Sequence, residues 1–176
     1  IRRFSRSPRL GGKRGHYQLL ASGKNVKNVK INLMREISAG IIIYRKTKEG
    51  LKFLLLYHGG GYWNFPKGKI EAEEKSFQAA LRETREETGL SGNELKIDQR
   101  FKAYEKFVFW RGHGIKKQKV FKVVIFYLAE TKKPQIRISY EHDGYGWFTY
   151  KEAMKILLKY KDSQRVLAQV HGLLIK

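Results

Sequence analysis

The chain has 176 residues, with 37 Lys or Arg against 16 Asp or Glu and a formal net charge of +21 at pH 7, a length that suits one domain with its own core. It contains no cysteine, which excludes disulfides and thiolate chemistry and fits a reducing compartment such as the cytoplasm. No apolar run approaches the ~20 residues that a membrane-spanning helix needs, so we expect no membrane partner; nothing in the sequence indicates an oligomeric state.

Residues 1–35 form a basic segment that differs from the rest of the chain. They hold ten Lys or Arg and no Asp or Glu. With little apolar periodicity, this composition favours a flexible N-terminal extension. Two alternatives stay open: an arm that contacts RNA, and the remnant of a targeting peptide, which would indicate an organelle. We expect the compact domain to occupy residues 36–176.

Two strands are predicted at the start of this domain. Residues 37–44 and 51–57 are nearly continuous apolar runs, separated by a turn rich in Lys, Glu and Gly. Runs of this kind are typical of strands that are covered on both faces.

The most informative stretch reads GKIEAEEKSFQAALRETREETGL and runs from Gly68 to Leu90. It predicts a helix, with Ser76 as the N-cap and Gly89 as a left-handed stop. An apolar stripe at helical spacing supports this prediction. Its members are Phe77, Ala80, Leu81, Thr84 and Thr88.

Three carboxylates share a second stripe of the same helix. Glu83, Glu86 and Glu87 are three and four residues apart, so their side chains crowd one another and repel by roughly 0.2–0.5 kcal/mol per exposed pair. A hard divalent cation turns this repulsion into binding. Magnesium prefers oxygen ligands and suits a site that also holds substrate phosphates, so the pattern points to a magnesium site.

After this helix the chain is predicted to return to strands and end in helices. Residues 95–110 and 120–130 read as two strands joined by a hairpin around 112–114, and residues 145–148 as a short strand. Helices are expected at 151–160 and 163–174. Strands followed by flanking helices indicate a layered α/β fold.

The stretch from Gly68 to Leu90 resembles the signature of the Nudix hydrolases. The preceding Tyr62–Gly68 segment, YWNFPKG, and the later Ile136–Trp147 segment, IRISYEHDGYGW, are similar to the asymmetric diadenosine tetraphosphate hydrolases. The resemblance covers roughly residues 36–160 and implies an α/β/α sandwich with a mixed central sheet.

The resemblance also implies a set of metal-binding residues. Glu83 and Glu87 should bind Mg²⁺, with Glu86 as a third ligand and the carbonyl of Gly68 as a backbone ligand. Mn²⁺ is a possible substitute. Glu141 would be an additional carboxylate that serves as a metal ligand or as the general base; the alternative is an acid on a surface loop.

Other residues take supporting roles by the same resemblance. Arg82 would orient the carboxylates through its rigid guanidinium fork. Glu74 is either an outer support of the site or a solvated acid at the helix start. Lys67 would stabilise phosphate charge, with His58 and Lys69 as weaker candidates for phosphate contact.

In the resembling subfamily, aromatic side chains stack on adenine. Phe107 and Tyr160 fall at approximately matching places, and Tyr145 lies nearby in the sequence. Stacking on a base is worth ~1–3 kcal/mol. Trp63 is assigned to the core rather than to the ligand.

The resulting expectation is a magnesium-dependent Nudix hydrolase that splits diadenosine tetraphosphate into ATP and AMP. One alternative is another Nudix substrate, such as the 5′ end of an RNA. A second alternative is a Nudix-fold binding module in a ribonucleoprotein, which the intact carboxylates argue against.

Overall fold

The computed structural model describes residues 33–113 and 117–176. The expectations for the basic segment fall almost entirely outside the described residues. Strand β1 begins at Leu33, three residues before the expected start of the domain.

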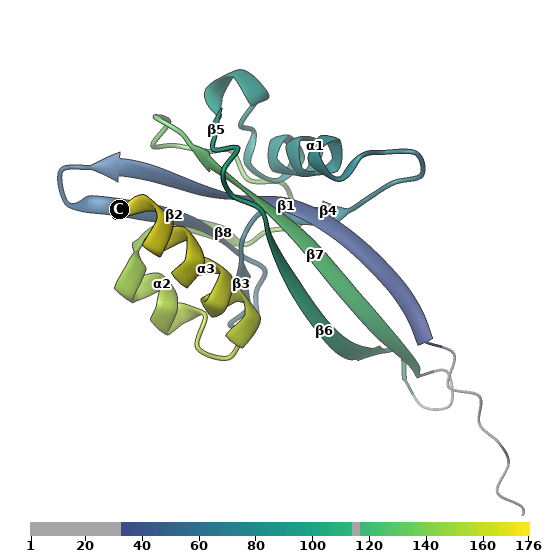
Figure 1. The fold of residues 1–176 in the computed structure, drawn as a ribbon. Helices are drawn as coiled ribbons and strands as arrows, with labels where there is room; N and C mark the ends of the chain where they lie inside the picture. The colour runs from purple at the N-terminus through teal and green to yellow at the C-terminus, as the bar shows by residue number, and fades with distance from the viewer. Residues whose placement is uncertain (1–32, 114–116) are drawn as a thin grey trace, which may run out of the picture. The chain divides into compact units, whose positions relative to one another are not determined.

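The described chain is built around an eight-stranded mixed sheet (Figure 1). The parallel pairing of β1 with β7 is its longest ladder, and β2 lies antiparallel on the other side of β1. The strands are β1 (Leu33–Thr47), β2 (Gly50–Tyr57), β3 (Trp63–Asn64), β4 (Lys67–Lys69), β5 (Lys96–Ile97), β6 (Ala103–Arg111), β7 (Gln118–Glu130) and β8 (Gly144–Thr149).

Helices cover both faces of the sheet, as Figure 1 shows. Helix α1 (Ser76–Thr88) lies on one face, and α2 (Tyr150–Ile156) and α3 (Lys161–Leu174) lie on the other. A short 3-10 helix, Gly92–Glu94, follows α1. Among the described residues, none of the helices has the length and apolar character needed to cross a bilayer.

Strand β1 explains why the apolar runs are continuous. Ile42 packs toward α2 and α3, whereas Ile41 and Ile43 pack toward α1, and all three are fully buried. Because successive side chains of a strand point to opposite faces, a strand between two helical layers needs apolar residues at every position. The predicted α/β/α sandwich with a mixed sheet is confirmed.

Three predicted element bounds were wrong. Residues 95–110 form two strands, because Asp98 interrupts them: its carboxylate accepts the backbone N–H of Arg100, and its carbonyl accepts that of Phe101. Helix α1 starts at Ser76, so the N-cap is Lys75, whose N–H donates to the Gln78 side chain. The helix predicted at 151–160 already ends at Ile156.

Candidate active site

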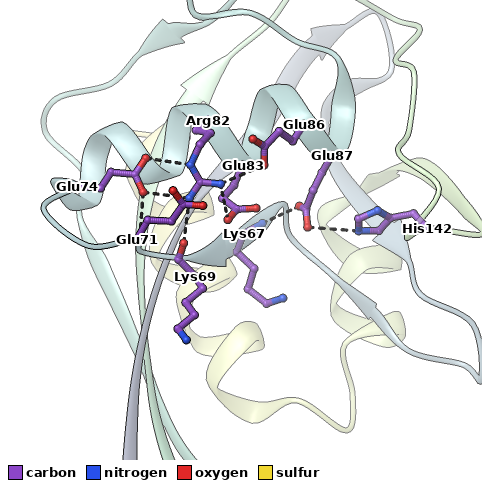
Figure 2. Close-up of polar contacts among 9 residues, drawn as sticks. All are labelled: Lys67, Lys69, Glu71, Glu74, Arg82, Glu83, Glu86, Glu87 and His142. Atoms are coloured by element: carbon purple, nitrogen blue, oxygen red, sulfur yellow. Dashed lines mark hydrogen bonds and ion pairs between the residues drawn. The ribbon is translucent and has the colours of Figure 1, made fainter.

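Arg82, in the middle of α1, donates hydrogen bonds to several groups around it (Figure 2). Its Nε and Nη2 donate to the two carboxylate oxygens of Glu74, both at 3.0 Å. Its Nη1 donates to Glu83 at 2.9 Å and to Glu86 at 3.0 Å, and Nη2 also donates to the carbonyl of Lys69. One guanidinium therefore contacts three carboxylates and also joins the helix to β4.

Gly68 lets the Glu83 carboxylate approach the backbone of β4. A Cβ built at Gly68 would overlap the carboxylate atoms of Glu83. Gly68 is held in place because β4 pairs antiparallel with β1, where Gly68 lies opposite Ala39. Burial raises the pKa of Glu83, and the contact with Arg82 opposes this shift.

Glu87 is the buried member of the carboxylate group. It accepts the backbone N–H of Lys67 at 2.9 Å, and the Nε2 of His142 lies 3.5 Å from its other oxygen. Burial raises the pKa of Glu87 to about 7, and the nearby Lys67 partly opposes the shift. A nearby cation would stabilise the charged form of such a buried carboxylate, because burial disfavours that form.

The loop between β7 and β8 brings Glu141 to the same place. Hydrogen bonds from Arg137 N to the carbonyl of Thr88 and from Ser139 N to that of Glu87 fasten this loop to the end of α1. Glu141 is exposed. With the helix carboxylates it borders a cleft of about 670 Å³, whose lining residues are Lys67, Gly68, Lys69, Glu71, Arg82, Glu83, Glu86, Glu87, Ser139, Tyr140 and Glu141.

The donor set of this cleft suits a hard cation, although no ready-made cage is present. Among residues 33–113 and 117–176, no three His, Asp or Glu side chains lie close enough together to hold a metal ion. Magnesium commonly binds through one or two carboxylates plus waters and substrate phosphates, so it does not require such a cage. The carboxylates and the Gly68 carbonyl supply only oxygen atoms, and the absence of a side chain at Gly68 lets the Glu83 carboxylate lie against the backbone of β4.

The side chain of Lys67 points to the opposite face of the sheet, away from α1 (Figure 2). Strand register puts two further polar residues in the next row of this face: Ser38 on β1, opposite Lys69, and Glu105 on β6, aligned with Ser38 through Val124 of β7. Burial lowers the pKa of Lys67, and the nearby carboxylates of Glu87 and Glu105 oppose this shift. Burial raises the pKa of Glu105.

We call the polar residues on this face, Lys67, Ser38 and Glu105, the polar floor. Two of their side-chain atoms have no hydrogen-bond partner. These are Oγ of Ser38 and Oε1 of Glu105, and both residues are almost fully buried. Because buried polar atoms are normally paired, these two indicate a place for ligand atoms or water. Lys122 lies one row further along the same face and adds a positive charge to it.

A series of ring contacts connects His142, which lies beside Glu87, with Tyr160, one of the aromatic candidates. The ring centroids of His142 and His58 are 4.4 Å apart, those of His58 and Tyr62 4.9 Å, and those of Tyr62 and Tyr160 5.1 Å. Burial lowers the pKa of His58 to about 4, with the Lys67 charge adding to the shift, so His58 is neutral at pH 7.

Comparison with known proteins decides the family. A model of the Nudix domain matches residues 34–170. The chain belongs to the Nudix family. It is 35% identical over 147 residues to the asymmetrical bis(5′-nucleosyl)-tetraphosphatase of Sus scrofa, an alignment that covers 78% of this chain and 94% of that protein. An RNA pyrophosphohydrolase of Vibrio cholerae is 28% identical over 134 residues, covering 71% and 77%.

A solved structure of a C. elegans Ap4A hydrolase in a binary complex shows the same Nudix fold. It superposes with a TM-score of 0.66 and 29% identity over 80% of this chain and 98% of that one. The predicted membership of the Nudix hydrolases, which are pyrophosphohydrolases, is thus confirmed.

This Nudix site brings most of the expected residues together, but not all of them. Phe107 and Tyr160 pack against the core cluster on the α2/α3 face, as does Trp63. Tyr145 packs on the α1 face, so the sheet separates it from Phe107 and Tyr160.

Two polar residues near the candidate site were not predicted from the sequence. Glu105 occupies an inward position on β6 between Ala103 and Phe107, and an acid in such an alternating pattern was a usable signal. His142 stands directly after Glu141 in the segment that carried the resemblance, yet no role was assigned to it.

Proposed function

We propose that this Nudix hydrolase cleaves a phosphoanhydride bond of dinucleoside polyphosphates, with diadenosine tetraphosphate giving ATP and AMP, and that the reaction depends on Mg²⁺. The single observation that carries the proposal is the cleft of about 670 Å³, which is lined by Gly68, Lys67 and five glutamates, Glu71, Glu83, Glu86, Glu87 and Glu141. The similarity to bis(5′-nucleosyl)-tetraphosphatases from several animals supports this substrate class.

Oxygen atoms from α1, β4 and the β7–β8 loop would hold the metal. They belong to Glu83, Glu86, Glu87, Glu141 and the carbonyl of Gly68. The bound cation, Mg²⁺ or Mn²⁺, would neutralise phosphate charge and lower the pKa of a coordinated water. Arg82 keeps the carboxylates oriented, because its fork contacts three of them at once.

The water that attacks phosphorus must lose a proton, and a carboxylate at the cleft is the base that takes it. Glu141 suits this role because it is exposed in the cleft and no Arg or Lys among the described residues pairs with it. The bond from phosphorus to the bridging oxygen breaks as the new bond forms, and the departing nucleotide keeps that oxygen.

The polar floor would receive the rest of the substrate. Lys67, Lys69 and Lys122 supply positive charge for phosphates, and His58 is placed to act as a neutral hydrogen-bonding group. Phe107 and Tyr160 are the aromatic side chains on this face that would stack on adenine.

A purified-protein assay with product identification tests the proposal. Dinucleoside polyphosphates of different lengths, damaged nucleoside triphosphates and 5′-triphosphorylated RNA are offered with Mg²⁺, with Mn²⁺ and with a chelator. Metal-dependent formation of ATP and AMP from diadenosine tetraphosphate is expected.

The second candidate is removal of pyrophosphate from RNA 5′ ends, which the similarity to RNA pyrophosphohydrolases of Vibrio favours. Faster release of pyrophosphate from RNA than of ATP from the dinucleotide would replace the first proposal with this one. Inactivity toward the whole panel would leave only the binding-module alternative.

A further inference from the structure

Strands β1, β6 and β7 run on past the helices as a three-stranded arm (Figure 1). We call the side of this arm that continues the α1 face of the sheet the arm face. Helix α1 packs over this face as far as Ala39 and Ile125. Beyond that row, three more rows of side chains cross the arm. The first holds Ile37, Val123 and Lys106, the second Arg35, Phe121 and Val108, and the third Lys119 and Trp110.

Large apolar side chains of the arm face are open to solvent. Ile37 is 51% exposed, Val108 49%, Trp110 50% and Tyr104, at the border of the arm, 46%. Exposed aromatic and aliphatic side chains that form one continuous strip indicate an interaction surface.

The charge on the arm face has one sign. Arg35, Lys106 and Lys119 stand among the apolar side chains, and the Nζ of Lys117 lies 5.6 Å from the centre of the Trp110 ring. None of the described residues on this face of the three strands is acidic, and none of these cations forms an ion pair with another described residue.

The acids of the arm belong to its other face. Glu36 lies there and is paired with Arg111, and Glu105 faces Lys67. The positive charge of the arm face is therefore not balanced within the described chain.

We propose that the arm face binds single-stranded nucleic acid, with Tyr104 and Trp110 stacking on bases and the interleaved cations contacting phosphates. Aromatic rings on an open sheet, set among cations, are the physical means by which proteins hold unpaired bases. The two aromatics are six residues apart on one strand, about 20 Å, which is enough for several nucleotides.

The positive charge of the arm face favours a nucleic acid over two other possible occupants, a second copy of the chain and residues 1–32. A second copy of the chain would bring the same cations against one another. Residues 1–32 carry nine Lys or Arg and no acid, so this segment would also be repelled. A duplex fits poorly, because its bases are already stacked and cannot meet the rings. The surface shares no residue with the catalytic cleft, so the inference is independent of the proposed function.

The test uses the full chain and a fluorescent twelve-nucleotide oligouridylate that lacks a 5′ phosphate and so is no substrate. Anisotropy titrations at several salt concentrations compare the parent with Trp110→Ala and with Lys106→Glu/Lys119→Glu. The matched control is Lys151→Glu/Lys155→Glu, which makes the same change of charge on two exposed positions of α2.

Trp110→Ala should weaken binding at least about fivefold, since it removes one stacking platform. Lys106→Glu/Lys119→Glu should also flatten the dependence of log affinity on log salt by about 0.7 for each lost phosphate contact. The control should lose much less affinity, and hydrolysis of diadenosine tetraphosphate should be unchanged in the arm variants.

Four results would each overturn the proposal. They are unchanged affinity of both arm variants, an equal loss in the α2 control, equal affinity for a duplex of the same length, and binding to phosphatidylserine vesicles without binding to the RNA. The last of these would assign the arm face to an anionic membrane surface.

Discussion

Gly68 and the Glu83 carboxylate fit together so closely that a single methyl group on Gly68 would collide with the carboxylate. This contact joins strand β4 to helix α1 at the point where the metal is proposed to bind. It gives the glycine that opens the family signature a steric role, which does not depend on backbone conformation because Gly68 has no positive φ.

Gly68→Ala should therefore push Glu83 out of position. A misplacement of about 1 Å in a catalytic constellation costs on the order of 100-fold in rate, and crowding should lower stability by about 1–3 kcal/mol. Gly172→Ala is the control, because a Cβ on this α3 glycine meets nothing within 4 Å; it should keep full activity and gain about 0.5–1 kcal/mol. Normal turnover of Gly68→Ala would show that Glu83 does not need its present position.

Glu87→Gln should lower turnover by about 100-fold or more, because the metal supplies several kcal/mol of transition-state stabilisation and the variant loses a charged ligand. The fold should survive, since an amide oxygen can still accept the Lys67 N–H that Glu87 accepts now. Calorimetric titration with Mg²⁺ and an assay at excess Mg²⁺ measure both effects. Glu49→Gln, in the exposed β1–β2 turn, serves as the control. Near-normal turnover with Glu87→Gln would show that Glu87 is not a metal ligand.

Glu141→Gln should reduce kcat much more than it changes KM, as expected for a group that acts mainly in the transition state. The fold should be unaffected, because the loop is fastened to α1 through the backbone N–H groups of Arg137 and Ser139 rather than through Glu141. Steady-state kinetics provide the comparison. A loss confined to KM would make Glu141 a substrate-positioning residue, and no loss at all would make it an ordinary loop acid.

The Glu36–Arg111 pair should stabilise the arm in a pH-dependent way. The hydrogen bond from Arg111 lowers the pKa of Glu36 below its ordinary value of 4.5, so the folded state binds this proton less tightly than the unfolded state. The stabilisation is present above pH 4.5 and is lost as the pH falls through the folded pKa. Arg111→Ala should lower Tm at pH 7, but only slightly, since Arg111 is half exposed and solvent screens the pair.

Thermal unfolding at pH 7, 5, 4 and 3 checks this expectation. The difference in Tm between parent and variant should be constant from pH 7 to 5 and should shrink below pH 4.5. A difference that stays the same at pH 3 would mean that Arg111 acts through packing, for instance against Phe109.

Removal of residues 1–30 should leave hydrolysis of a dinucleoside polyphosphate within a few fold of the parent, because every proposed catalytic residue follows β1. We propose that the basic segment is a separate extension, and a cut before Ile31 spares the strand that starts at Leu33. Activity and Tm of the shortened chain are the measurements. A collapse of activity would show that the catalytic domain reaches further toward the N-terminus.

Local information was enough to predict α1 and the carboxylate group. The spacing of Glu83, Glu86 and Glu87 defines a face of a helix without reference to any other part of the chain, and Gly89 ends the helix in the left-handed conformation expected of it. The relation between Arg82 and the carboxylates was also local, since three of its partners lie within eight residues.

Features that depend on strand register could not be predicted in the same way. Glu105 shares a row with Ser38 and lies near the charge of Lys67 only because β6, β7, β1 and β4 align in one order. The same register decides which aromatic residues share a face. Tyr145 was grouped with Phe107 and Tyr160 because it lies nearby in the sequence, but its strand pairs with β2, and its side chain points to the α1 layer.

The parallel pairing of β1 with β7 also limits the order in which parts of the domain can fold. Leu33 lies beside Lys119 and Tyr44 beside Glu130, so each of these partners is 86 positions away in the chain. A refolding polypeptide must close loops of this length before β1 gains its second neighbour, and such distant pairings are slow to form. The β1–β2 hairpin can form early, but the row that holds Lys69, Ser38 and Glu105, next to Lys67, cannot assemble until β7 is in place. We therefore expect the polar floor to be one of the last parts of the domain to form.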